Sequence, residues 1–351
     1  MAAPPPKPWV ETPCVKSTTL SNKAGCNIYL KLENQQPSGS FKSRGLGNHM
    51  LKAFAHHGTS KPVHFYCSSG GNAGMACATA AISLGRPATI VVPLTTSAFM
   101  IEKLKSLGVE VVQMGRQWSE ADSYLREELL AKDEHGVYVP PFDHPDVWEG
   151  HSTLVDEVER TMLDHGGYDA MVCSVGGGGL FSGIMESLEK HGRLLQNGSR
   201  QGRAIKVLAI ETVGTGSLAA SLKEKKLVRL PAVSGIANTL GAAQVAERAF
   251  EYALRPEVVS ATLSDAEAAM GSVDFADDER ILVESACGAT LATAYNGMIR
   301  TQLFPEDSDE QFKERSVVLV VCGGSAVNIE LLHTYRETYG KDEGMLSRWA
   351  K

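Results

Sequence analysis

Short apolar runs rich in Val and Ile alternate with longer segments of helical pattern along the chain, and this alternation limits the folds open to it. The runs are nearly continuous in apolar residues, as in NIYLKLE, PATIVVP and SVVLVVC. Strands buried on both faces have this composition, and strands connected through helices pair in parallel. Strands are expected near residues 27–33, 62–67, 87–93, 109–113, 170–175, 206–211 and 316–322. Helices are expected near residues 41–57, 72–84, 97–107, 119–132, 148–164, 179–190, 240–254, 265–274, 284–302 and 325–338. The pattern predicts an α/β protein whose mostly parallel sheets are covered by helices.

Segment 134–147 interrupts this alternation. It contains Pro140-Pro141 and Pro145, so we expect a linker between two α/β units there. The length of 351 residues also suggests two domains or one large unit. Two helix starts are predicted by capping-box spacing, at Ser119 with Asp122 and at Ser264 with Glu267.

Composition and charge exclude several classes of protein. The net charge is −7, which argues against a nucleic-acid or anionic-membrane partner, since either requires a concentrated basic surface. No apolar run approaches the about 20 residues that span a bilayer, and the Pro-rich start lacks the apolar core of a secretory signal. The 7 cysteines are scattered without a CxxC pair, and the 10 histidines form no HExxH motif. We therefore expect buried free thiols, a reducing compartment such as the cytoplasm, and no structural zinc site.

The first segment that carries chemistry is SGSFKSRG at residues 38–45. A strand ends before it, and Ser40 is placed to cap a helix that holds Lys42 in its first turn. The positive end of the helix dipole favours the neutral amine of a lysine at this position. A neutral amine is the form that a Schiff-base lysine requires.

A second segment, CSSGGNAG at residues 67–74, follows the next predicted strand and opens a helix. Such a turn presents backbone N–H groups and hydroxyls to an anion, and a carboxylate would suit it. A tight turn alone would explain Gly70 and Gly71, but not Ser68, Ser69 and Asn72 together.

Two further strand–glycine–helix segments are SVGGGGL at 174–180 and VCGGS at 321–325. Four consecutive glycines allow a backbone to surround a phosphate at a helix N-terminus. A dinucleotide site with Glu211 as the ribose ligand is the alternative, but GGGGL lacks the G-x-G-x-x-G spacing and Glu211 follows too late in the chain. A monophosphate is therefore favoured over a pyrophosphate.

In this order, the four segments resemble those of the fold-type-II pyridoxal-phosphate (PLP) enzymes, and most closely the catabolic L-serine/L-threonine dehydratases. The resemblance extends from about residue 8 to about residue 338 and includes PPFDHPDVWEGHSTLVDE at 140–157 and LVESACGA at 282–289. It implies two open, twisted, mostly parallel sheets flanked by helices, as in the tryptophan-synthase β-subunit. The domains implied are a large PLP-binding domain of residues 1–36 and 146–351 and a small domain of residues 37–145.

The resemblance also implies a role for each motif residue in holding PLP. Lys42 would form the Schiff base with the cofactor and act as the catalytic residue, and Phe41 would pack on one face of the ring. Asn72 would bond to the 3-hydroxyl group, and Cys322 would face the pyridine nitrogen and leave it largely unprotonated. The phosphate would be held by Gly176, Gly177, Gly178 and Gly179.

The substrate carboxylate would be received by Ser69 and its neighbours Ser68, Gly70 and Asn72, and glycine at position 70 would leave a roomier substrate pocket. A monovalent cation would bind beside the phosphate site, and K⁺ is the ion expected there. The positions that match its ligands are Gly176, Glu211, Thr215, Ser217, Leu240 and Ala242. The chain departs from the family at Thr215 and at Thr239, where alanine is common and, at Thr239, covers the other ring face.

The activity implied is β-elimination of L-serine to pyruvate and ammonia, with conversion of L-threonine to 2-oxobutyrate as a second activity. An L-threonine-preferring dehydratase is the alternative within the family. Ala73 argues against a serine racemase, and Cys322 argues against a cysteine synthase. Alternatives of another class are a dinucleotide-dependent oxidoreductase and a silent PLP-binding protein. The resemblance further implies a cytoplasmic homodimer that acts in amino-acid catabolism and gluconeogenesis on a small amino-acid substrate.

Overall fold

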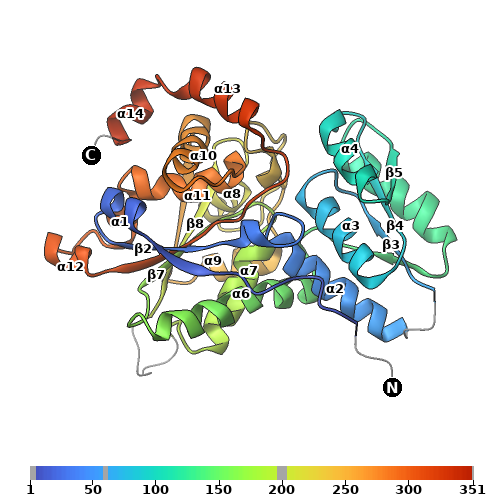
Figure 1. Ribbon diagram of the computed structural model, residues 1–351, viewed down its shortest axis with the longest axis horizontal. Coiled ribbons are helices and arrows are strands. Elements are labelled where there is room, and N and C mark those ends of the chain that lie inside the picture. Colours follow the sequence, from blue (N-terminus) through green and yellow to red (C-terminus); the bar gives the residue numbers. More distant parts are fainter. Residues whose placement is uncertain (1–4, 58–61, 196–203, 350–351) are drawn as a thin grey trace.

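Two separate sheets organise the chain in the computed structural model, which describes residues 5–57, 62–195 and 204–349. The larger sheet has six strands in the order β1-β2-β10-β7-β8-β9, and the smaller has four in the order β5-β4-β3-β6. All neighbouring strands are parallel except β1 and β2, which are antiparallel. The predicted fold class is therefore confirmed. Figure 1 shows the smaller sheet with α3 and α4 at one end of the molecule.

The strands agree with the buried runs of the sequence. In the larger sheet they are β1 (Cys14–Ser17), β2 (Asn27–Lys31), β10 (Ser316–Val320), β7 (Ala170–Ser174), β8 (Lys206–Thr212) and β9 (Val258–Leu263). In the smaller sheet they are β5 (Glu110–Gln113), β4 (Ala88–Val92), β3 (His64–Cys67) and β6 (Gly136–Tyr138). Strands β1, β6 and β9 were not predicted, and β6 lies inside the expected linker. Segment 134–147 thus contributes an edge strand to the smaller sheet, which corrects the linker prediction.

Helices connect the strands and cover both sheets. They are α1 (Thr18–Ala24), α2 (Lys42–His57), α3 (Asn72–Leu84), α4 (Ala98–Ser106), α5 (Trp118–Tyr124), α6 (Pro145–Leu163), α7 (Gly179–Lys190), α8 (Ser217–Glu224), α9 (Glu247–Ala253), α10 (Asp265–Glu279), α11 (Ser285–Tyr295), α12 (Asp309–Lys313), α13 (Ile329–Tyr339) and α14 (Glu343–Trp349). Short 3₁₀ turns are η1 (Glu33–Gln35), η3 (Leu130–Lys132) and η4 (Asn238–Leu240), and π-helical turns are η2 (Leu125–Leu129) and η5 (Ile299–Leu303). No helix in these ranges is long and apolar enough to cross a membrane.

One of the two predicted helix caps is present. Ser264 and Glu267 form a reciprocal capping box at the start of α10. Ser119 lies inside α5, whose N-cap is Gln117, so that prediction is wrong. The predicted helix at 240–254 is also shorter than expected, because regular helix begins only at Glu247.

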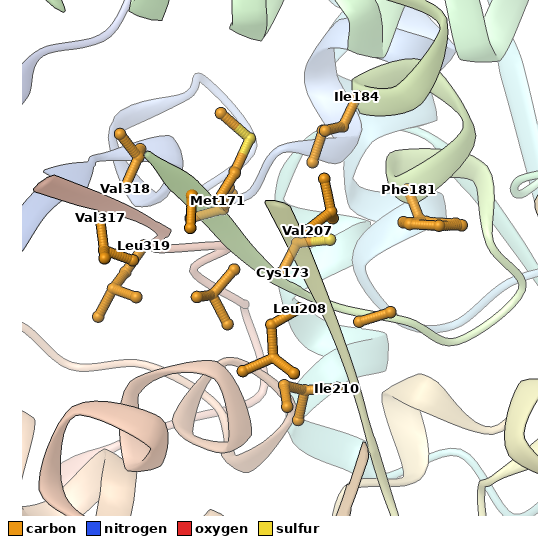
Figure 2. Close-up of a cluster of buried hydrophobic side chains, with 14 of the residues drawn as sticks. Met171, Cys173, Phe181, Ile184, Val207, Leu208, Ile210, Val317, Val318 and Leu319 are labelled. Carbon is orange, nitrogen blue, oxygen red and sulfur yellow. The ribbon is translucent and has the colours of Figure 1, made fainter. Parts of the chain in front are cut away.

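The main core lies on both faces of the larger sheet. Met171, Cys173 and Val207 lie toward Phe181 and Ile184 of α7 (Figure 2). Leu208 and Ile210 point to the opposite face, as alternation along a strand requires. Helices α10 and α11 pack together, and α11 contacts β7, β8 and β10.

Helix α2 connects the two parts of the molecule. It packs against α6 on one side and α3 on the other (Figure 1). The strands divide between the predicted large and small domains, whereas α2 contacts both. The domain boundaries therefore stay a prediction.

Candidate active site

The turn before α2 is held against the segment that follows β10. Ser40 forms an isolated antiparallel bridge with Gly323, and the Phe41 N–H donates to the Cys322 carbonyl at 3.2 Å. The Ser325 hydroxyl donates to the Ser38 carbonyl at 3.1 Å. The buried Ser40 hydroxyl has no hydrogen-bond partner among the described residues, so the predicted side-chain cap is wrong. Backbone pairing with a distant segment, rather than a cap, fixes the start of α2.

Lys42 is the first residue of α2. Its Nζ donates to the carbonyl of Pro141 and lies 5.3 Å from the centre of the Phe41 ring. Burial lowers the pKa of Lys42 to about 8, against an opposing effect of the Cys67 and Cys322 thiols. Desolvation is therefore the main cause of the lowered pKa, where the sequence suggested the helix dipole. With a pKa of about 8, the protonated amine still predominates at pH 7, and the neutral amine gains as the pH rises through 8.

A buried ion network anchors the first turn of α2. The Arg44 guanidinium donates to both carboxylate oxygens of Glu33, at 2.7 and 2.8 Å. It also donates to both oxygens of Glu157, at 2.6 and 2.7 Å, and Glu157 accepts from Lys31. Arg44, Glu33 and Lys31 are fully buried. Opposite charges at these distances compensate the cost of burying them, and they join α2 to β2 and α6.

The loop 68–72 follows β3 and opens α3. The Ser68 hydroxyl donates to Asp122 at 2.6 Å, so this hydroxyl faces α5 and only its backbone is left for a ligand. Ser69 accepts from the Gly71 N–H, and the Ser69 carbonyl lies so close to Gly74 that a Cβ there would be 1.8 Å away. The N–H group of Asn72 donates to no acceptor among the described residues. Such groups at a helix N-terminus suit an anion.

Gly70 lies against residues of β4 and of the connection that follows it. A Cβ on Gly70 would lie 2.7 Å from the Thr96 Cγ2 atom and 3.2 Å from Val92 Cγ1. The space that glycine leaves is filled by Thr96. A side chain at position 70 would meet Thr96 first, and the expectation of a roomier substrate pocket stays a prediction.

Glu284 organises three elements of the site, a role that is not among those predicted from the sequence. Its Oε2 accepts from Asn72 Nδ2 at 3.0 Å and from Thr239 Oγ1 at 2.9 Å, and its Oε1 accepts from the Ala326 N–H at 2.7 Å. The Asn72 amide oxygen in turn accepts from the Ser325 N–H at 2.9 Å. Glu284 is only 6% exposed. One buried carboxylate therefore fixes the orientation of Asn72 and Thr239, and its place in LVESACGA was the only available hint.

The glycine loop follows β7 and opens α7. Gly178 has φ +89°, which side chains rarely adopt, and a Cβ on Gly177 would collide with the Phe142 ring. The N–H groups of Gly176–Gly179 donate to no acceptor within the described chain. Phe142 follows Pro141, the acceptor of Lys42, so the loop lies close to the lysine segment. These N–H groups suit a phosphate at the start of α7.

Cys322 lies in the core beside other thiols. It is 7% exposed, and both a hydrogen bond with Cys287 and burial raise the pKa of its thiol well above the usual value. The thiol is therefore neutral at physiological pH. Its orientation toward a pyridine nitrogen stays a prediction.

The predicted cation ligands gather at the ends of β7 and β8. Glu211 is fully buried and accepts from the Leu218 and Ala219 N–H groups at 2.8 and 2.7 Å. Burial raises the pKa of Glu211 to about 7, although these N–H groups act to lower it. The Ser217 hydroxyl is buried without a partner among the described residues.

The other predicted cation ligands already take part in hydrogen bonds or close contacts within the chain. The Thr215 hydroxyl is engaged with Thr212, at 2.8 Å from its hydroxyl. The Leu240 carbonyl accepts from the Ala242 N–H at 2.7 Å, and a Cβ on Gly176 would lie 2.9 Å from Leu240. Glu211 and Ser217 therefore carry the case for a cation.

The four segments that the sequence singled out thus meet at the carboxyl ends of parallel strands. Three of them are joined by the direct hydrogen bonds described above, and the glycine loop adjoins them through Phe142. In open α/β sheets, ligands bind at this edge.

Comparison with known proteins identifies the class. A family model described as pyridoxal-phosphate dependent enzyme matches residues 7–323. The chain is 43% identical over 334 residues to L-serine dehydratase/L-threonine deaminase of Bos taurus, which covers 95% of this chain and 96% of the bovine protein. It is 41% identical over 332 residues to a human serine dehydratase-like protein, with 95% of each chain covered. A crystal structure of a fungal L-serine ammonia-lyase from Rhizomucor miehei superposes with a TM-score of 0.84 at 34% identity, covering 94% of this chain and 99% of the fungal one.

The chain belongs to the pyridoxal-phosphate-dependent enzyme family. This confirms the resemblance seen in the sequence and excludes the dinucleotide alternative. The residues present fit the cofactor, because Lys42 has a lowered pKa and the N–H groups at the start of α7 lack partners. Lys42 would hold PLP covalently and Gly176–Gly179 would hold its phosphate.

Proposed function

We propose that this protein is an L-serine dehydratase that also acts on L-threonine. The products are pyruvate and ammonia from serine, and 2-oxobutyrate and ammonia from threonine. The observation that carries the proposal is the Lys42 amine, with its lowered pKa, on a segment that residues 322–325 join by hydrogen bonds to the start of α3, where the loop 68–72 ends. Its further support is the 43% identity to the bovine L-serine dehydratase/L-threonine deaminase.

Lys42 Nζ is the base that takes the Cα proton of the substrate. When bound, PLP supplies the electron withdrawal that makes this proton acidic. A base works best when its pKa lies close to the working pH, and burial brings Lys42 to about 8. The backbone carbonyl of Pro141 holds the amine in position.

The loop 68–72 binds the substrate carboxylate. Its N–H groups at the start of α3 have the positive potential that an anion requires. Asn72, held by Glu284, orients the cofactor hydroxyl. The β-hydroxyl of serine takes up a proton, which balances the one that Lys42 removes from Cα, and leaves as water. A water molecule then hydrolyses the C=N group of the remaining product to give pyruvate and ammonia.

A silent PLP-binding protein and an L-threonine-preferring dehydratase are the competing proposals. Purified protein loaded with PLP should form pyruvate from L-serine, measured by coupling to lactate dehydrogenase. Lys42→Ala should abolish this activity, whereas Lys190→Ala, which removes an exposed lysine of α7, should retain it. PLP binding without product from either amino acid would support the silent protein, and a higher kcat/KM for L-threonine would support the second alternative.

We also propose a monovalent cation site in which Glu211 and Ser217 bind K⁺. Its support is a fully buried carboxylate and a buried hydroxyl without a partner. K⁺ would stabilise the charge of Glu211 and hold the loop 174–179 close to it, because β7 and β8 are neighbours. Activity should depend on K⁺ and fall in Li⁺, and Glu211→Gln should remove that dependence. Equal activity of the unchanged protein in both salts would contradict the site.

Finally, we propose that the protein acts as a homodimer in the cytoplasm and contributes to amino-acid catabolism and gluconeogenesis. The support for the compartment is that all seven cysteines are buried free thiols. Light scattering coupled to gel filtration should give twice the chain mass of 37.6 kDa.

A further inference from the structure

Three metal-ligating side chains meet where α2 packs against the start of α6. His49 lies on α2, His144 caps α6, and Asp146 lies in the first turn of α6. One ligand atom from each residue lies within 4.8 Å of the other two. The Asp146 Oδ2 atom is 3.5 Å from His49 Nδ1 and 3.6 Å from His144 Nδ1. No other such group of three occurs within the ranges that the structure describes.

His49 has the arrangement of a metal ligand. It is 8% exposed, and its Nε2 donates to the Tyr138 carbonyl at 3.0 Å, which fixes the ring and leaves Nδ1 with a lone pair. This Nδ1 is buried without a hydrogen-bond partner among the described residues. Metal-binding histidines commonly donate their other ring nitrogen to a backbone carbonyl in this way.

Asp146 presents one oxygen to the two histidines. Its Oδ1 accepts from Lys52 at 2.9 Å, which leaves Oδ2 toward the imidazoles.

The distances suit a small transition-metal ion. Bonds of about 2.0–2.1 Å in a tetrahedral site place neighbouring ligand atoms about 3.3 Å apart, close to the two distances found here. We propose that His49, His144 and Asp146 bind a divalent zinc-class ion, with water as the fourth ligand. The ion would replace the hydrogen bond in which His144 Nδ1 accepts from the Asp146 N–H. Nitrogen and oxygen donors without thiolate favour Zn²⁺ over the softer Cu⁺.

Such an ion would connect two segments next to the catalytic lysine. α2 begins at Lys42, and the segment just before His144 carries Pro141, the acceptor of Lys42 Nζ. The bound metal would hold this segment against α2 and stabilise the folded protein by mass action.

The test is Zn²⁺ titration of the PLP-loaded protein by calorimetry, after removal of metals and of free PLP. His144→Asn is the main variant, because asparagine is a good N-cap and keeps the start of α6 intact. His165→Asn, which removes an exposed histidine outside the group, is the matched control. Asp146→Asn is the second variant.

The unchanged protein and His165→Asn should bind one Zn²⁺ per chain and melt at a higher temperature with it. His144→Asn and Asp146→Asn should each weaken binding by at least about tenfold and lose the thermal shift, since losing a supporting group alone costs that much. The proposal is overturned if the unchanged protein binds no Zn²⁺. It is equally overturned if His144→Asn binds as tightly as His165→Asn, because the ion then occupies another site.

Discussion

Glu284→Gln tests how strongly one buried carboxylate organises the site. The carboxylate accepts from Asn72 and Thr239 through one oxygen and from the Ala326 N–H through the other. A glutamine amide keeps only one oxygen, so its NH₂ group must face at least one of these donors. The amide loses the fewest hydrogen bonds when its oxygen accepts from Asn72 and Thr239 and its NH₂ group faces Ala326, so the bond from the Ala326 N–H is lost.

The size of the effect follows from that lost bond. A hydrogen bond to a charged group contributes about 1.5–3 kcal/mol, and a buried donor left unpaired costs about 1–3 kcal/mol. The bonds that remain become neutral and about half as strong. We therefore expect the free energy of unfolding to fall by about 2 kcal/mol. If the misplacement of Asn72 also costs about 2 kcal/mol of transition-state stabilisation, kcat/KM for L-serine falls about 30-fold, since about 1.4 kcal/mol equals a factor of ten.

The assay is kcat/KM for L-serine together with PLP affinity and urea unfolding. Glu257→Gln is the control, because Glu257 is also buried but accepts from Leu195 and pairs with Arg255, outside the site described here. Both variants should lose stability, but only Glu284→Gln should lose PLP affinity and kcat/KM. Equal kcat/KM in the two variants would refute the reasoning.

Three further predictions concern the surroundings of Lys42. Arg44→Met should lower the free energy of unfolding by about 3–5 kcal/mol, because Glu33 would be left buried without its ion-pair partner and Glu157 would keep only Lys31; an unchanged urea midpoint would contradict this. The pH profile of kcat should rise as pH increases through about 8, because Lys42 is a base only when deprotonated and its pKa is lowered to that value; a flat profile there would assign the base elsewhere. Gly70→Ala should lower activity on serine and threonine alike, and adding Thr96→Ser should restore part of it by removing the methyl group that the new Cβ meets; a change of substrate preference without such rescue would count against this.

The features predicted well from the sequence are local ones. Each strand–turn–helix motif combines an apolar run with glycines and hydroxyl residues only a few positions apart, and the structure has β3, β7 and β10 just before their motifs. Strands β6 and β9 escaped prediction because they are short or half-buried edge strands with a weak apolar pattern.

The features that the sequence could not reveal depend on contacts between distant segments. Glu284 is an unremarkable acidic residue until folding brings Asn72 and Thr239 to it. A Cβ at Gly70 would be crowded only because Thr96, in the connection between β4 and α4, packs against this position. The Ser40 cap failed for the same reason, since pairing with Gly323 replaced it.

The most direct measurement is peptide mapping of the PLP-loaded protein after borohydride reduction. Reduction turns a Schiff base into a stable amine, and mass spectrometry then locates the pyridoxyl group. Lys42 should carry it, because its amine has a lowered pKa and lies at the meeting point of the four motifs. Lys31, a fully buried lysine near this helix, is held by Glu157 and should remain unmodified. A pyridoxyl group on Lys31 or on any lysine other than Lys42 would contradict the assignment of the site.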